Sequence, residues 1–192
     1  MHARSLAPAF IKRLIWNRKP FNQQTTPEKC PQDIQNALAV HLGESKSLLD
    51  FGCGPGNLLM ALRARGWRGH YIGIDVSDKA IHLARKLRDQ NSEWFRCLIE
   101  DFPGIEVDTV SFIESLYYAR NVPRVLERWR GAAIFIRIYD SARHQDTLQH
   151  LSHFGFTQSE ALWSMEPTKL LPAQAPVNTR PSLPATGTTG SA

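Results

Sequence analysis

Residues 48–59, LLDFGCGPGNLL, place three glycines within five positions, directly after an apolar run that ends in an aspartate. Glycine lets the backbone of a turn approach a ligand closely, because it has no β-carbon. A dinucleotide site would space its glycines as GxGxxG and bind pyrophosphate at the following helix, whereas position 57 here is asparagine. Asp50 would repel a pyrophosphate and attract positively charged groups. The loop therefore favours a cationic ligand that is built on a nucleotide.

Further acidic residues follow the next two apolar runs. In YIGIDVS, Asp75 lies 19 residues after Gly56, close to the spacing of about 20 at which α/β nucleotide sites place the acid that binds ribose. The segment CLIEDFP then supplies Glu100, Asp101 and Phe102. Singly, each acid could cap a turn or a helix, but their order and spacing together favour a ligand site.

With these motifs, the sequence resembles the class I S-adenosylmethionine-dependent methyltransferases over about residues 31–163. The first motif of that family reads acidic-x-Gly-x-Gly-x-Gly, and DFGCGPG fits every position. The resemblance implies S-adenosylmethionine as cofactor and S-adenosylhomocysteine as product. It implies that Asp75 binds both ribose hydroxyls, that Val76 flanks the adenine, and that Asp101, with Glu100 as competitor, reads the adenine amino group. The implied cofactor-binding residues are Asp50, Gly52, Cys53, Gly54, Gly56, Asp75, Val76, Asp101, Phe102 and Glu114.

Catalytic candidates follow the fourth and fifth predicted strands, because the carboxyl ends of strands face the ligand crevice in an open α/β sheet. The segment VDTVSFIESLYY also resembles the fourth motif of the family. We predict Glu114, Tyr117 and His144 as catalytic residues, with His144 as the general base whose pKa is nearest to neutral. His144 could instead be a solvated residue at a helix start, and the tyrosines half-buried packing. The wider set of candidates is Tyr118, Arg137, Tyr139, Asp140 and Arg143.

The residues after the fourth strand also bear on the acceptor. Methyltransferases that act on nucleic-acid bases and glutamine amides commonly carry Asn/Asp-Pro-Pro-aromatic there, whereas this chain has ESLY. We predict methyl transfer to an O, N or C nucleophile of a small molecule by in-line displacement, without a metal, since no convincing ligand set is present. A non-catalytic cofactor-binding subunit with a protein partner, or a cofactor-bound enzyme of other chemistry, are the alternatives. A homodimer stays open, and RNA or protein acceptors are less favoured.

The elements that must position these residues alternate between strand and helix, which predicts a doubly wound, mostly parallel α/β sheet with helices on both faces. The pattern gives no clear seventh strand, so it stays open whether the antiparallel hairpin that usually closes the sheet of this family is present. Predicted strands cover residues 46–51, 70–75, 93–100, 108–115, 131–140 and 156–163, and predicted helices cover residues 30–43, 56–66, 77–90, 121–129 and 145–155.

Composition divides the 192 residues into three parts: a basic N-terminal arm or lid (1–30), a cofactor-binding domain (31–166) and a low-complexity flexible tail (167–192). No apolar run approaches the roughly 20 residues that span a bilayer. Three cysteines without CxxC spacing favour a reduced cytoplasm, although the arm also resembles an organelle-targeting segment. The net charge of +5 comes from Arg4, Lys12, Arg13, Arg18 and Lys19, so the body carries no bias toward nucleic acid.

Overall fold

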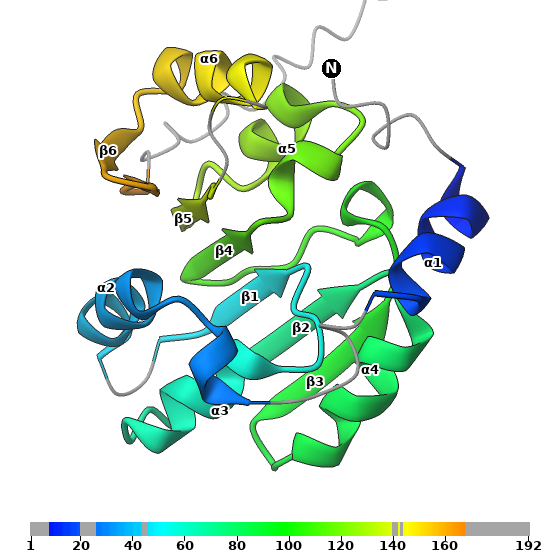
Figure 1. Ribbon diagram of the computed structural model, residues 1–192. Coiled ribbons are helices and arrows are strands. Elements are labelled where there is room, and N and C mark those ends of the chain that lie inside the picture. The colour runs from blue at the N-terminus through cyan, green and yellow to red at the C-terminus, as the bar shows by residue number, and fades with distance from the viewer. Residues whose placement is uncertain (1–7, 20–25, 44–45, 140–141, 143, 168–192) are drawn as a thin grey trace, which may run out of the picture.

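The computed structural model describes residues 8–19, 26–43, 46–139, 142 and 144–167 (Figure 1). Within these residues, one mixed sheet has the strand order β3-β2-β1-β4-β5-β7-β6. The first five strands are parallel, and β6 and β7 run antiparallel at one edge. The strands are β1 (Leu48–Phe51), β2 (Tyr71–Asp75), β3 (Ser92–Arg96), β4 (Thr109–Ile113), β5 (Ala133–Arg137), β6 (Thr157–Ser159) and β7 (Leu162–Met165).

Helices cover both faces of the sheet, as the near-continuous apolar strands predict. Along β1, Leu48 packs in one apolar core while the next residue, Leu49, packs in the other. The first core includes residues of α2 (Gln32–Leu42), α3 (Asn57–Ala64) and α4 (Asp78–Ala84), and the second includes residues of α5 (Val122–Arg128) and α6 (Gln145–His153). The predicted α/β fold class is therefore confirmed. Single 3₁₀ turns complete the connections at η3 (Pro27–Lys29), η4 (Arg85–Leu87), η5 (Ile99–Asp101) and η6 (Leu116–Tyr118).

The seventh strand, which the sequence pattern left open, is present and completes the sheet. Residues 156–163, which the sequence pattern joins into one strand, contain β6 and the start of β7, and β7 pairs with β5 so that Ile134 lies opposite Met165. The turn between β6 and β7 includes Glu160, which has a positive φ of 53°. The pattern hid this turn because glycine or asparagine usually marks such a position, and because β6 has only three residues, all exposed.

Helix α1 (Ala9–Asn17) belongs to the predicted arm and packs beside α4, near the carboxyl ends of the central strands (Figure 1). Its Lys12 is only 4% exposed and donates a hydrogen bond from Nζ to the carbonyl oxygen of Tyr118 over 3.0 Å. Arg13 pairs with Asp78 at 3.2 Å. Two of the five cations that set the net charge are thus engaged with the body of the protein.

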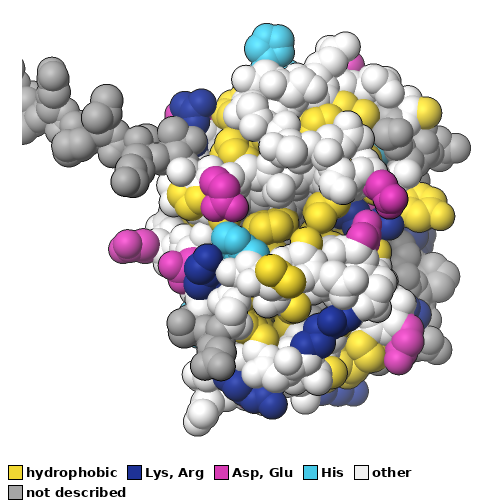
Figure 2. Space-filling view, turned by 90° about the vertical axis from the view of Figure 1, so that its left-hand side faces the viewer, with side chains coloured by type: hydrophobic (Ala, Val, Ile, Leu, Met, Phe, Trp, Pro, Cys, Tyr) yellow, Lys and Arg dark blue, Asp and Glu magenta, His cyan; other side chains and the backbone are white. Residues whose placement is uncertain are grey.

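The surface carries both apolar and charged side chains, with Phe10, Val40 and Tyr139 among the exposed large apolar residues. Among the described residues, no helix is long and apolar enough to cross a membrane. Both basic and acidic side chains occur across the face that Figure 2 shows. The predicted tail lies outside the described residues except for Pro167.

Candidate functional site

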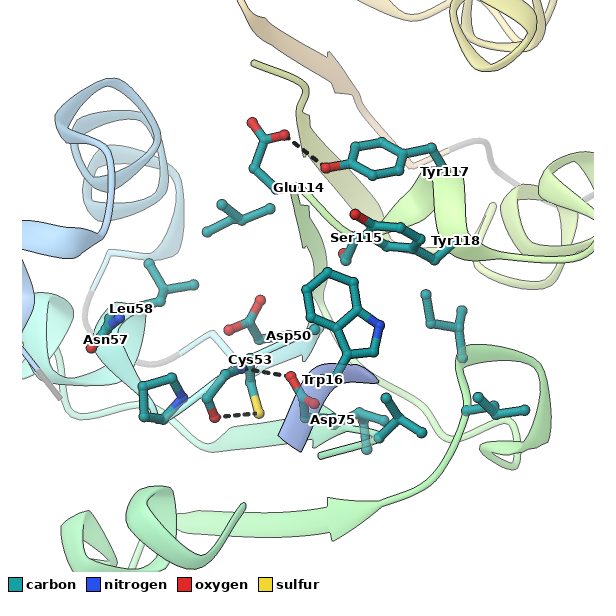
Figure 3. Close-up of a pocket in the computed structure, with 18 of the residues that line it drawn as sticks. Trp16, Asp50, Cys53, Asn57, Leu58, Asp75, Glu114, Ser115, Tyr117 and Tyr118 are labelled. Atoms are coloured by element: carbon teal, nitrogen blue, oxygen red, sulfur yellow. Dashed lines mark hydrogen bonds between the residues drawn. The ribbon is translucent and has the colours of Figure 1, made fainter. Parts of the chain in front are cut away.

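A cavity of about 610 Å³ opens at the carboxyl ends of β1, β2 and β4 (Figure 3). Its size lies within the range of roughly 300–1,000 Å³ that is usual for small-molecule sites. Side chains from α1 contribute to its wall through Lys12 and Trp16. The remaining wall comes from the glycine loop after β1, the end of β2, the segment after β3 and the residues that follow β4, together with residues 29–31 and Tyr139.

Backbone conformation and neighbouring side chains explain much of the glycine content of the loop after β1. Gly52, Gly54 and Gly56 have φ values of 77°, 55° and 89°, which β-carbon-bearing residues rarely adopt. A β-carbon on Gly52 would also collide with the Ser115 side chain, and one on Gly56 would lie 2.8 Å from Leu87 Cδ1. Gly52 and Gly54 both line the cavity, and Gly56 does not. Gly52 and Gly56 are also required by neighbouring protein side chains, which leave no room for a β-carbon.

Asp75 lies at the end of β2 and lines the cavity beside the glycine loop. One carboxylate oxygen accepts a hydrogen bond from the Gly54 amide over 3.0 Å, and the other accepts one from the Ser77 amide over 2.8 Å. Burial raises the pKa of Asp75, although these amides oppose the shift. Each oxygen keeps a further acceptor direction, so the carboxylate can still receive hydroxyl groups. Val76 also lines the cavity.

Asp50 is 2% exposed and contributes to the same wall. It accepts hydrogen bonds of 2.7 Å from the Tyr71 hydroxyl and from the Ser111 hydroxyl. Burial raises the pKa of Asp50 to about 6 despite these bonds. Cys53 is buried next to it, and burial also raises the pKa of that thiol. A buried acid of this kind is stabilised by a cationic ligand.

The segment after β3 differs from the sequence prediction. Strand β3 ends at Arg96, so Asp101 follows in η5, where it is exposed and does not line the cavity. Phe102 packs in the apolar core against Phe51. The cavity wall is formed instead by residues 97–100, including Glu100, the competitor of Asp101. Glu100 accepts a hydrogen bond from the Arg120 amide.

Glu114 is fixed at the opposite end of the drawn site from Asp75 (Figure 3). Its carboxylate accepts a hydrogen bond of 3.0 Å from the Tyr117 hydroxyl and one of 3.2 Å from Arg137. Arg137 in turn donates to both oxygens of Asp33 at 2.9 Å. Burial raises the pKa of Glu114, and its hydrogen bonds oppose that shift. Asp33 had no predicted role, because a contact between residues 104 positions apart leaves no local signal.

His144 does not line the cavity, in contrast to Tyr117 and Tyr118. It is 8% exposed, and its ring stacks on Tyr117 with centroids 3.7 Å apart. The structure therefore brings Glu114 and Tyr117 together at the cavity and places His144 behind the tyrosine. Tyr139 also lines the cavity, whereas Asp140 and Arg143 lie outside the described residues.

The cavity fits a positively charged nucleoside ligand. Its loop end presents Asp50 and the ribose candidate Asp75, whose two oxygens are already oriented by backbone amides. Among the described residues, no group of acidic residues, cysteines and histidines is arranged to hold a metal ion. Fold and site together are those of an α/β protein with a small-molecule cavity at the carboxyl ends of its parallel strands.

Comparison with known proteins identifies the family. The methyltransferase domain matches residues 22–167, so the chain belongs to this family, and the predicted family is confirmed. The match begins inside the predicted arm. No curated protein sequence matches the chain.

Solved methyltransferases share the fold. The N-methyltransferase NodS from Bradyrhizobium japonicum WM9, in complex with S-adenosylhomocysteine, has a TM-score of 0.60 at 17% identity, over 80% of this chain and 89% of that one. Magnesium protoporphyrin IX methyltransferase from Synechocystis PCC 6803, with bound S-adenosylmethionine, has a TM-score of 0.59 at 17% identity, covering 85% and 96%. The plantazolicin methyltransferase BpumL has a TM-score of 0.55 at 19% identity, covering 80% of this chain but 65% of its own.

Proposed function

We propose that this protein transfers a methyl group from S-adenosylmethionine to a small-molecule acceptor. The observation that carries this proposal is the single cavity wall that joins the glycine loop and Asp75 to Glu114 and Tyr117, in a chain of the methyltransferase-domain family. Solved structures with the same fold hold S-adenosylmethionine or S-adenosylhomocysteine, which supports this cofactor.

The residues of the chain have the tasks of binding, aligning and excluding water. The sulfonium cofactor supplies a methyl group that is already activated. Asp75 binds the ribose hydroxyls, and Asp50 compensates positive charge at the loop end. Helix α1 places Trp16 and Lys12 over the cavity, which reduces the access of water to the reacting groups.

A small acceptor fits the enclosed geometry better than a macromolecule. The cavity volume of about 610 Å³ must hold cofactor and acceptor together, and α1 lies over it as the proposed lid. The closing hairpin and this helix also weaken the case for a non-catalytic subunit, which depended on a missing strand and a sparse cap. The free thiols of Cys30, Cys53 and Cys97 support a reducing compartment such as the cytoplasm.

The proposal is tested by isothermal titration calorimetry with S-adenosylmethionine, S-adenosylhomocysteine and NAD in parallel. We expect micromolar binding of the first two and no binding of NAD. Asp75→Ala should weaken the binding of S-adenosylhomocysteine by about 2–4 kcal/mol, because charged hydrogen bonds to the ribose are lost. Binding of NAD alone, or an unchanged affinity in the folded variant, would refute the proposed site.

A further inference from the structure

The carboxylate of Glu114 is held by two side chains. Tyr117 of η6 and Arg137 at the end of β5 donate to its two oxygens, and the nearby backbone of Tyr139 also favours the charged form. The Glu114 amide donates to the Arg137 carbonyl oxygen over 3.0 Å, so main chain and side chain connect the same two residues. A carboxylate has about four acceptor directions, so Glu114 keeps the capacity to accept a hydrogen bond from a ligand in the cavity.

The backbone at Glu114 is unusual as well. Its φ is 53°, and among the described residues that carry a β-carbon only Glu160 shares a positive φ. Glu160 lies in an exposed hairpin turn, where such a conformation is ordinary. Glu114 instead follows β4 at the cavity wall, where surrounding contacts must maintain the strain. Strained residues of this kind cluster at ligand sites.

The charge of this cluster is negative. Arg137 is paired with both Asp33 and Glu114, so the three side chains sum to one negative charge. Neither Arg137 nor Asp33 lines the cavity, and Glu114 alone of the three presents its charge there. The cations that do line the cavity, Lys12 and Lys29, come from α1 and η3. An acceptor with its own carboxylate or phosphate at this end would be repelled.

We propose that Glu114 binds the reacting nitrogen of an amine acceptor, with Arg137 and Asp33 as positioning residues. This inference rests on the proposed methyl transfer and specifies its substrate class. Burial raises the pKa of Glu114 above that of a free glutamate, but a carboxylate is still a far weaker base than an alkoxide, so it is poorly suited to deprotonating an alcohol by itself. It is suited to accept an N–H hydrogen bond and so to direct the nitrogen lone pair.

The chemistry balances without a further reactant. The nitrogen lone pair forms the new bond to the methyl carbon while the carbon–sulfur bond breaks, and the electron pair of that bond remains on sulfur. Positive charge thereby moves to the nitrogen, next to a fixed carboxylate, where it is stabilised. The nitrogen then loses its proton through Glu114 to water.

The test offers the full-length protein and methyl-labelled S-adenosylmethionine to three pools of compounds that share the same aliphatic and aromatic skeletons. The pools contain amines, then alcohols and phenols, then carboxylic acids. We expect label in the amine pool, and a roughly 100-fold lower rate for Glu114→Gln, with unchanged affinity for S-adenosylhomocysteine. Failure to label the amine pool by a protein that binds the cofactor, or a wild-type rate in Glu114→Gln, would overturn the inference.

Two further variants separate this role from folding. Glu160→Gln makes the same change at the same φ of 53°, away from the cavity, and should keep both the rate and the cofactor affinity. Asp33→Asn should lower kcat for the amine that is labelled, and Asp33→Glu should restore part of it. If neither the wild-type protein nor any variant binds the cofactor, the proposed methyl transfer itself is refuted. That outcome is distinct from a failure of the proposed amine acceptor, in which the cofactor still binds.

Discussion

The buried carboxylate of Asp50 combines two opposing influences. Two hydroxyl groups donate to it at 2.7 Å and favour its charged form, yet burial dominates and raises its pKa to about 6. In the unfolded chain an aspartate titrates near 3.9. The folded protein without ligand therefore holds this proton more tightly than the unfolded chain does, and charging Asp50 without a cationic ligand destabilises the fold.

This difference predicts a pH-dependent effect of Asp50→Asn. The stabilisation from the raised pKa is full below about pH 4 and is lost as the pH rises through about 6. The uncharged variant should thus gain about 1 kcal/mol more stability relative to wild type at pH 8 than at pH 5. Urea unfolding of the ligand-free proteins at both pH values measures this. An equal difference at the two pH values would show that Asp50 does not titrate in this range.

A pair of glycines with nearly the same φ can distinguish the cost of backbone strain from the cost of steric overlap when alanine is introduced. Gly56 and Gly66 have φ values of 89° and 90°, but a β-carbon would lie 2.9 Å from Trp94 at Gly56 and meets nothing within 4 Å at Gly66. Gly66→Ala should cost about 1 kcal/mol from the left-handed backbone alone. Gly56→Ala should cost about 1–3 kcal/mol more through overpacking.

Denaturant unfolding of both glycine variants provides the comparison. Equal losses of stability would mean that Leu87 and Trp94 move aside without cost, and that the third glycine of the loop is required only for its φ.

Among the elements, α1 is bonded to the turn that follows Asp75, the proposed ribose-binding residue. Asn17 accepts a hydrogen bond of 2.8 Å from the Ser77 hydroxyl and one of 3.3 Å from the Lys79 amide, and it donates to Asp78 over 3.2 Å. Ser77 itself caps α4 and follows Asp75 by two residues. The position of the proposed lid and the geometry of the cofactor end are therefore coupled through one short segment.

We expect Asn17→Ala to speed the dissociation of S-adenosylhomocysteine about tenfold, because the loss of these hydrogen bonds loosens α1 by about 1–2 kcal/mol. Stopped-flow displacement measures the rate. Asn36→Ala is the matched control, since Asn36 lies on the exposed face of α2 and bonds only locally to Gln32 in the described structure. Equal rates in wild type and Asn17→Ala would argue against a lid role for α1.

The sequence predicted the elements with strong periodicity and missed those that lack it. Five parallel strands and their helices follow from apolar runs that alternate with helical faces. The hairpin of β6 and β7 escaped detection because its first strand is polar and its turn has Glu160 where glycine would be expected. The end of β3 was placed four residues too late, since an apolar run, CLI, continues into the cavity wall beyond Arg96.

At the scale of the whole molecule, the cavity collects residues from distant parts of the chain. Local motifs predicted Asp50, Gly54 and Asp75, which do lie at one wall. They did not predict the ion pair between Asp33 and Arg137. This pair forms because the fold buries the Arg137 guanidinium, which then needs carboxylate partners, and no local sequence motif records that burial. Whether the predicted residues bind the cofactor is a matter for the calorimetric test.

All three cysteines line this cavity. Burial raises the pKa of Cys97 to about 11 and that of Cys30 to about 12, and only the thiolate reacts rapidly. Alkylation of the folded protein should therefore be slow at pH 7, and that of Cys97, the most exposed of the three, should accelerate about tenfold per pH unit up to pH 9. Saturating S-adenosylhomocysteine should slow it.

Mass spectrometry of the alkylated peptides resolves the three sites. Labelling that S-adenosylhomocysteine leaves unchanged at every cysteine, at a concentration that saturates binding, would place the cofactor outside this cavity.

The contact between Lys12 and Tyr118 spans 106 residues, and this has a consequence for biosynthesis. At a translation rate of roughly 5–20 residues per second, the ribosome needs about 5–20 s after it has made Lys12 to reach its partner. Helix α1 can therefore contact α4 well before its bond to Tyr118 can form. Until residue 118 has been made, Lys12, which is 4% exposed in the folded protein, has no access to this acceptor, so the buried position of its ammonium group is completed late in synthesis.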